Sequence, residues 1–156
     1  MKAKEIIEKL GLERHPEGGW FGETYRSDEF LGDRNRNVST AIYYLLEGED
    51  KSKLHRLKSD EIWHFYAGDS LVIEGINPDG SHFTKILGSN LDKGEQLQIV
   101  VRRDTWFGAY LENGKSFVLL GCTVAPGFNF DDFELGDREI LIEKYPQHKE
   151  LIEKLT

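Results

Sequence analysis

The pattern of apolar and polar positions divides the chain into a long central region of strand-like segments with a helical segment at each end. From about Gly19 to Val124, short runs of aromatic and β-branched residues alternate with turns that contain Gly, Asp or Asn. No helical pattern separates these runs, and several connections carry tight-turn residues, such as Asn77-Pro-Asp-Gly80 and Glu112-Asn-Gly114. The pattern therefore predicts mostly antiparallel strands, at residues 20–26, 39–46, 52–57, 61–67, 70–76, 81–87, 96–101, 105–111 and 116–124.

Two helical extensions frame this region. Residues 3–10 place Ile6, Ile7 and Leu10 on one helical face, and Gly11 follows where a helix would end. A second helix is predicted at 137–145, with Asp137 as its cap and Pro146 after its end, and a third at about 147–155. The sequence thus predicts a mainly β protein with a single domain over 1–156. Its jelly-roll β-barrel would span about 19–124, with helical extensions at 2–11 and 137–155.

Charge and composition exclude several classes of function. Lys and Arg number 20 against 28 Asp and Glu, which gives a net charge of −8 that repels nucleic-acid phosphates. The longest apolar runs are far shorter than the roughly 20 residues of a membrane-spanning helix. Cys122 is the single cysteine, and the first residues carry charges where a signal peptide would be apolar. We therefore expect no nucleic-acid or membrane partner and a cytoplasmic location.

One pair of residues could carry chemistry. His55 and Glu61 lie on consecutive predicted strands, and a turn between them would let both side chains point into the same interior. An imidazole and a carboxylate could bind a metal ion there, or the carboxylate could orient the imidazole for proton transfer. Alternatively, the two residues have no functional role and are a surface histidine and a solvated glutamate in a charged loop. The spacing alone does not separate these readings.

The residues around this pair resemble a known family. The spacing His55-x-Leu57-x3-Glu61-x6-Gly68 resembles the first cupin motif, His-x-His-x3-4-Glu-x6-Gly. Further motifs, including His15-Pro-Glu-Gly-Gly-Trp-Phe, Glu61-Ile-Trp-His-Phe-Tyr-Ala-Gly and Val124-Ala-Pro-Gly-Phe, resemble a cupin family first described as a domain of unknown function. Members of that family have been likened to sugar-nucleotide epimerases. The resemblance implies the cupin fold and pairing into a homodimer.

The chain departs from the metal-binding form of the cupin motifs at two positions. Leu57 stands where the first motif has its second histidine, and Trp106 aligns with the histidine of the second motif. His55 and Glu61 alone remain, whereas stable sites for first-row metals use three or four protein ligands. We therefore expect no cofactor, and a divalent metal ion at His55 and Glu61 is the less favoured alternative.

An aromatic residue, Trp106, replaces one of the lost ligands, which favours a site for a small molecule. Trp63 and Trp106 would line a concave pocket, and Tyr110 shares the strand parity of Trp106. Tyr25 and Arg26 are further candidates for binding a substrate such as a sugar or a sugar nucleotide. Alternatively, both tryptophans only fill the core, which is the commoner use of this residue.

The likeness to metal-independent epimerases of cupin fold implies a mechanism. His55 would remove a proton next to a ketone, and Glu61 would hold the histidine tautomer. Tyr44, or else Tyr110 or Tyr25, would return the proton from the opposite face, and Arg26 would stabilise the enolate oxygen. Two other readings stay open, a ligand-binding module without catalysis and a weakly metal-dependent enzyme.

The segment from His15 to Arg26 is a second unusual cluster. Pro16 keeps His15 extended, and Gly18-Gly19 permits a sharp bend before the first predicted strand. This segment could cover the mouth of the barrel, or it could be an ordinary turn leading into that strand.

Overall fold

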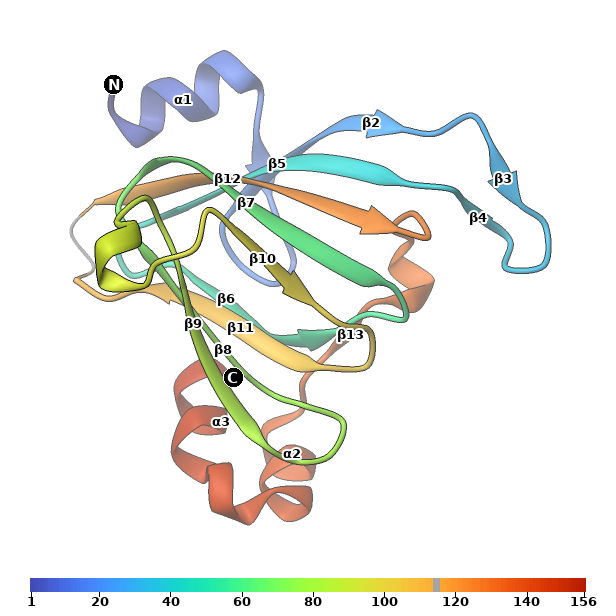
Figure 1. Cartoon of the computed structure of the whole chain (residues 1–156), viewed down its shortest axis with the longest axis vertical. Coiled ribbons are helices and arrows are strands. Elements are labelled where there is room, and N and C mark those ends of the chain that lie inside the picture. Colours follow the sequence, from blue (N-terminus) through green and yellow to red (C-terminus); the bar gives the residue numbers. More distant parts are fainter. Residues whose placement is uncertain (114–115) are drawn as a thin grey trace.

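The structure is a computed structural model that describes residues 1–113 and 116–156, and two antiparallel sheets packed face to face dominate it (Figure 1). Gly114, the last residue of a predicted turn, lies outside the described residues. Between the sheets, apolar side chains from both layers interdigitate, including Leu46 and Leu120 from one sheet and Ile73 and Phe107 from the other. The strand pattern of the sequence thus buries one face of each sheet.

The first sheet has six strands, and every neighbouring pair in it is antiparallel. Their order across the sheet is β1-β2-β5-β12-β7-β10. The strands are β1 (Glu13–Arg14), β2 (Trp20–Arg26), β5 (Thr40–Glu47), β12 (Phe117–Ala125), β7 (Asp60–Gly68) and β10 (Gln98–Val101). Beyond β2 and β5, the chain continues into a projecting hairpin made of β3 (Phe30–Leu31) and β4 (Arg36–Asn37) (Figure 1).

The second sheet has five strands, again all antiparallel. Its order is β13-β6-β11-β8-β9, so β6 and β7, which follow one another in sequence, lie in different sheets. The strands are β13 (Glu134–Leu135), β6 (Lys51–Arg56), β11 (Trp106–Leu111), β8 (Leu71–Ile76) and β9 (His82–Leu87). The crossing from β6 to β7 brings His55 and Glu61 onto facing layers.

The sheets do not close into a barrel, which corrects one part of the fold predicted from the sequence. No strand of one sheet is paired with a strand of the other within the described residues. The isolated bridge between Leu87 and Gln96 links only the end of β9 to the segment that precedes β10. The architecture is a jelly-roll-like β-sandwich.

Helices cover the outer faces of the sandwich. Near the N-terminus, α1 (Ala3–Leu10) packs Ala3 and Ile6 against Leu45 on the outer face of the six-stranded sheet, and Gly11 ends the helix in the left-handed conformation. The C-terminal helices α2 (Arg138–Lys144) and α3 (Lys149–Leu155) pack on the outer face of the five-stranded sheet (Figure 1). The predicted helices are therefore confirmed within one or two residues.

The remaining elements are short. Single turns of 3-10 helix lie at η1 (Leu91–Lys93), η2 (Phe130–Asp132) and η3 (Pro146–His148). The four two-residue strands β1, β3, β4 and β13 are too short for a periodic pattern, and the sequence did not indicate them. Within the described residues, no helix combines the length and the apolar character that crossing a membrane requires.

Candidate functional site

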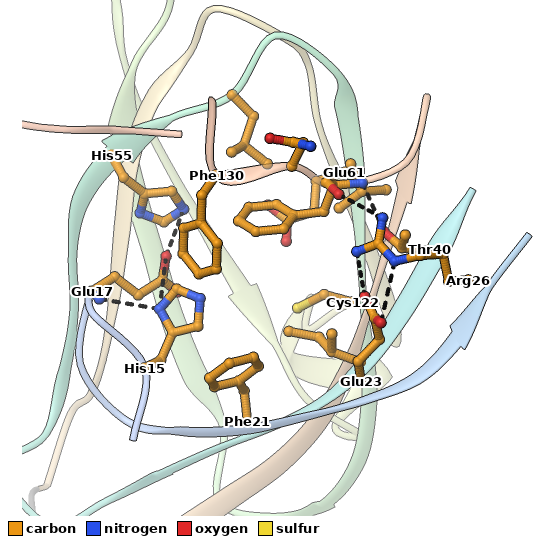
Figure 2. A pocket seen from close by; sticks show the side chains of 15 residues that line it. His15, Glu17, Phe21, Glu23, Arg26, Thr40, His55, Glu61, Cys122 and Phe130 are labelled. Carbon is orange, nitrogen blue, oxygen red and sulfur yellow. Dashed lines mark hydrogen bonds and ion pairs between the residues drawn. The ribbon is translucent and has the colours of Figure 1, made fainter. Parts of the chain in front are cut away.

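A cavity of about 380 Å³ lies between the sheets and is the candidate site (Figure 2). Its volume falls in the range of ligand pockets, about 300–1,000 Å³. Both sheets and three connecting segments contribute to its wall. The lining residues are His15, Glu17, Phe21, Glu23, Arg26, Thr40, Ile42, His55, Leu57, Glu61, Cys122, Val124, Phe128, Asn129 and Phe130.

His55 enters the cavity from β6 and is fully engaged by the protein. Its Nδ1 lies 2.7 Å from the Lys53 carbonyl oxygen, which can only accept, so Nδ1 carries a proton and donates it. Its Nε2 lies 3.2 Å from Oε2 of Glu17. His55 and Glu61 form no ion pair in the described structure, which corrects the expectation that Glu61 orients this imidazole. Glu17 is the partner that sequence reasoning missed.

Glu17 reaches His55 because residues 15–19 fold against the edge of β6. The backbone N–H of Lys53 donates to the Glu17 carbonyl oxygen at 2.8 Å, and Ser52 Oγ donates to Glu17 Oε1 at 3.0 Å. Gly18 has a φ of 108°, and a Cβ there would overlap the Lys51 carbonyl oxygen, so the close approach requires glycine. This loop covers the first half of the β6 edge, and β13 covers the second half.

The facing atoms of His55 and Glu17 imply a shared proton. Because Nδ1 of His55 holds the ring proton of a neutral imidazole, Nε2 has a lone pair, and an ionised Glu17 would face it with another lone pair. A contact of 3.2 Å between them therefore needs one proton, held by the imidazole or by the carboxyl group. Burial lowers the pKa of His55 and raises that of Glu17, so burial disfavours the charged form of each group.

His15 lies beside this pair and presents its other ring nitrogen to the cavity. The backbone N–H of Glu17 donates to Nδ1 of His15 at 3.1 Å, which makes Nδ1 an acceptor. In the neutral ring the proton therefore sits on Nε2, and Figure 2 shows this nitrogen pointing into the open centre. Burial lowers the pKa of His15 and favours the neutral form, although nearby Glu17 raises it.

Glu61 faces the pair from the other sheet, on β7 (Figure 2). Its side chain is buried, and its Oε2 has no hydrogen-bond partner among the described residues. Burial raises its pKa to about 7, with His55 lowering it and Glu17 raising it. Cys122 lies near this carboxyl group, and burial raises the pKa of its thiol well above the usual value. Glu61 is thus a buried acid with one oxygen that lacks a hydrogen bond and with a pKa of about 7.

Aromatic rings and one arginine complete the cavity. Phe21 from β2 and Phe128 and Phe130 from the loop after β12 line its wall. Arg26 also lines it, as the sequence predicted, but its guanidinium is committed to Glu23 at 2.6 Å and to the Phe128 carbonyl oxygen at 3.1 Å. Arg26 therefore fixes the aromatic loop against β2, and its charge is offset by Glu23.

Trp106 and Tyr110 are absent from the lining and lie on the opposite face of the sheet. In the pairing of β11 with β6, Phe107 stands opposite His55, and directly paired residues share a face. The ring of Phe107 accordingly contacts His55, with centroids 4.3 Å apart. Trp106 packs instead against α2 and α3, and Tyr110 donates to Glu74 Oε2 at 3.0 Å. The motif alignment placed the inward position one residue too early.

Three more of the predicted site residues do not line the cavity. Trp63 faces inward as predicted but is buried in the core, where its ring contacts Tyr44 and Phe107. Tyr44 is buried too, and its hydroxyl donates to the Gly18 carbonyl oxygen at 2.5 Å, so it is held in the wall below the cavity surface. Tyr25 is 55% exposed on the outside of the sheet. None of these phenols is placed to return a proton.

The donor set does not fit a metal ion in the manner of the cupin motif. The positions beside His55 hold Leu57 and Phe107, which have no donor atoms, and His55 Nε2 already faces Glu17. In residues 1–113 and 116–156, no group of three or more His, Cys, Asp or Glu side chains is arranged to hold a metal ion. We therefore derive no step through a metal.

Known proteins share both the sequence and the fold. A family model described as Cupin superfamily (DUF985) matches residues 4–136. Protein SO0799 from Shewanella oneidensis has a crystal structure with a TM-score of 0.94 and 43% identity, covering 100% of this chain and 98% of that one. The protein YML079W of Saccharomyces cerevisiae is 30% identical over 156 residues, which cover 88% of this chain and 77% of the yeast protein. Oxalate decarboxylase from Bacillus subtilis matches 92% of this chain with 36% of its own, at a TM-score of 0.59 and 15% identity, which shows a shared fold.

Proposed function

The chain belongs to the Cupin superfamily (DUF985) family, and from this premise we propose that its cavity binds a small carbonyl compound and catalyses proton transfer at the carbon next to the carbonyl group. The reaction class would be epimerisation or isomerisation without a metal ion. The sequence analysis predicted the same reaction class with His55 as the base, whereas we now assign the base to Glu61.

One observation carries the proposal, namely that the buried carboxyl group of Glu61 lines the cavity and has a pKa of about 7. A general base works best when its pKa lies near the operating pH, because it is then both ionised and basic enough to take a proton. Leaving a buried carboxyl oxygen without a hydrogen bond costs stability, about 1–3 kcal/mol for a typical polar group.

The arrangement supports proton transfer from two sides. Glu61 comes from β7 of the six-stranded sheet, whereas the Glu17–His55 pair, which holds a proton, joins the loop between β1 and β2 to β6 of the other sheet. In the proposed step Glu61 takes the proton from the carbon, the C–H electron pair forms a carbon–carbon double bond, and the carbonyl oxygen gains the charge. Return of a proton from Glu17 to the opposite face of the same carbon would re-form the carbonyl group and invert the centre, whereas return from Glu61 to the face that it deprotonated would regenerate the substrate. His55 acts through Glu17, since both of its ring nitrogens are engaged.

Solvent-deuterium incorporation tests this proposal. Keto sugars, sugar nucleotides and small ketones would be incubated with the protein in D₂O, and exchange at the carbon next to the carbonyl would be followed by NMR. Glu61→Gln keeps the shape of the side chain but removes the base, so we expect at least a hundredfold slower exchange, the size typical of general-base catalysis. Glu74→Gln, on the outer face of the other sheet, is the matched control. Exchange by Glu61→Gln at the parental rate would refute the assignment.

A binding module without catalysis is the second candidate, because an apolar cavity with unpartnered polar atoms suits ligand binding as well as turnover. In that case a ligand would raise the melting temperature while no deuterium entered it. The weakly metal-dependent enzyme would require His55 or Glu61 to rearrange, and stoichiometric metal in protein purified without a His-tag would support it. Homodimer formation and a cytoplasmic location stay predictions, and light scattering in solution would test the first.

A further inference from the structure

We propose that the cavity accepts an uncharged carbonyl compound whose oxygen is bound by the Nε2–H group of neutral His15. The inference rests on the proposed function and deepens it, because it names the part of the substrate that is recognised and the residue that recognises it. Three observations carry it: the hydrogen bond on Nδ1, the free Nε2 in the cavity, and the charges around them.

The hydrogen bond on Nδ1 fixes which nitrogen of His15 can donate. The donor to Nδ1 is the backbone N–H of Glu17, which always carries its hydrogen, so Nδ1 must supply the lone pair. The 15–19 loop holds this contact, since the N–H of His15 donates to the Gly19 carbonyl oxygen and the N–H of Gly18 donates to the His15 carbonyl oxygen. Loop geometry therefore orients Nε2–H toward the cavity before any ligand arrives.

The surroundings of His15 keep the ring neutral and hold it in place. Its side chain is 7% exposed and lies within about 6 Å, centroid to centroid, of the rings of Phe21, Tyr44 and Phe133. The ionisable groups that face it are Glu17, whose Oε2 lies 3.9 Å from Nδ1, and His55. Nε2 forms no hydrogen bond with any of the described residues, so this donor is available to a ligand.

The charges of the wall favour an uncharged ligand. Glu17, Glu23 and Glu61 contribute three carboxyl groups to the lining, and Arg26 is the one arginine or lysine among the lining residues. The Arg26 guanidinium is already paired with Glu23. A carboxylate or phosphate inside would lose its hydration without meeting an arginine or lysine that is free of Glu23, whereas a carbonyl oxygen needs only one donor. In a sugar nucleotide the phosphates would have to remain outside.

Neutral His15 would also serve the proposed reaction. When Glu61 takes the proton from the carbon, negative charge moves to the carbonyl oxygen, and a hydrogen bond to that oxygen strengthens. A neutral imidazole can donate to the oxygen throughout without losing its proton. No other bond changes at His15, so the atoms and charges of the step remain balanced.

The test uses ¹⁵N-histidine-labelled full-length protein with cyclohexanone as the carbonyl probe and cyclohexanecarboxylate as its charged counterpart. We expect the His15 nitrogen spectrum of the free protein at pH 7 to show the neutral form with the proton on Nε2. Cyclohexanone should shift the Nε2 signal in a saturable manner, and cyclohexanecarboxylate should leave it unchanged. An imidazolium, a proton on Nδ1, or equal binding of both probes would overturn the inference.

Two variants make the test sharper. In His15→Gln the amide nitrogen stands near the position of Nε2 and can still donate, whereas in His15→Asn the shorter amide stands near Nδ1. We expect His15→Asn to weaken cyclohexanone binding about tenfold, the value of one hydrogen bond, and His15→Gln to bind within about threefold of the parent. If His15→Asn fails to fold, the labelled parent and His15→Gln still test the role of His15. Loss of cyclohexanone binding in His15→Gln would contradict that role.

These outcomes are separable from the proposed function. If cyclohexanone shifts Nε2 but no ketone exchanges deuterium, then His15 binds carbonyl oxygens and the catalytic proposal fails. If deuterium exchanges while the Nε2 signal stays in place, then proton transfer stands and the role of His15 is wrong.

Discussion

Both faces of the five-stranded sheet carry aromatic residues. Those on the outer face pack against helices, and those on the inner face surround the candidate site. On the outer face, Trp106 is covered by α2 and α3 and by the guanidinium of Arg56, 4.6 Å from its ring. On the inner face, the adjacent Phe107 supports His55 at the edge of a cavity. One step along the strand therefore separates a residue that stabilises the fold from one that shapes the site.

Hydrogen bonding sharpens the contrast. On the outer face, the hydroxyl of Tyr110 donates to Glu74, and Lys154 lies 3.5 Å from the centre of its ring. Across the cavity, Glu61 keeps an oxygen without a partner, and Nε2 of His15 is free as well. Most buried polar groups in proteins are hydrogen-bonded, so an unsatisfied one calls for an explanation. The contrast favours the cavity, rather than the tryptophan-bearing outer face, as the place where a ligand would bind.

The largest expected effect is on the outer face. Trp106→Ala should lower the free energy of unfolding by about 3–5 kcal/mol, because it removes a large buried ring between the sheet and the C-terminal helices. Urea unfolding would measure it. Trp106→Phe, a milder change, should leave the His15 nitrogen spectrum and its response to cyclohexanone as in the parent. A changed response would mean that the two faces are coupled and would break the comparison.

The next effect is on the inner face and depends on pH. The pKa of Glu61 rises from 4.5 in the unfolded chain to about 7 on folding, so the folded state holds this proton more tightly. The stability that this group contributes is complete below about pH 4.5 and is lost as the pH rises through 7, by up to about 3 kcal/mol. Glu61→Gln cannot titrate, so its stability relative to the parent should increase between pH 4.5 and 8. Urea unfolding at both pH values would show this, and parallel pH profiles would contradict it.

The smallest effect concerns Tyr110. Tyr110→Phe removes only the hydroxyl that donates to Glu74 in a half-buried position, so we expect a loss of about 0.5–1.5 kcal/mol. Thermal unfolding would measure the loss. Deuterium exchange into a ketone should proceed at the parental rate in this variant, because Tyr110 lies outside the cavity. A slower rate would restore the tyrosine to the site and count against our correction.

Sequence periodicity predicted most of the fold, because strands and helices leave repeating apolar patterns. The segment 20–26 matches β2, and 81–87 and 105–111 differ from β9 and β11 by one residue. Whether the two sheets close into a barrel could not be predicted from such patterns, because closure depends on which strand edges pair across the molecule. The predicted inward position of Trp106 was wrong as well. It came from a motif alignment, which identifies a residue along the chain but does not determine which face of the strand its side chain occupies.

The site was predicted in part. Spacing placed His55 and Glu61 in the same interior, and both line the cavity. Glu17 and His15 were missed as members of the site, although their segment had drawn attention through Pro16 and the two glycines. Their contact with His55 depends on a loop that folds back onto β6, 35 residues or more away in sequence, and no local pattern encodes such a return.

The loop of residues 15–19 also protects the protein against association with other chains. An uncovered strand edge offers free amide and carbonyl groups to any other chain, and together this loop and β13 occupy that side of β6. A substitution that loosens the loop, such as Gly18→Val, would therefore do more than disturb the site. It would expose the edge of β6 to pairing with other chains, so we expect such a variant to aggregate during purification.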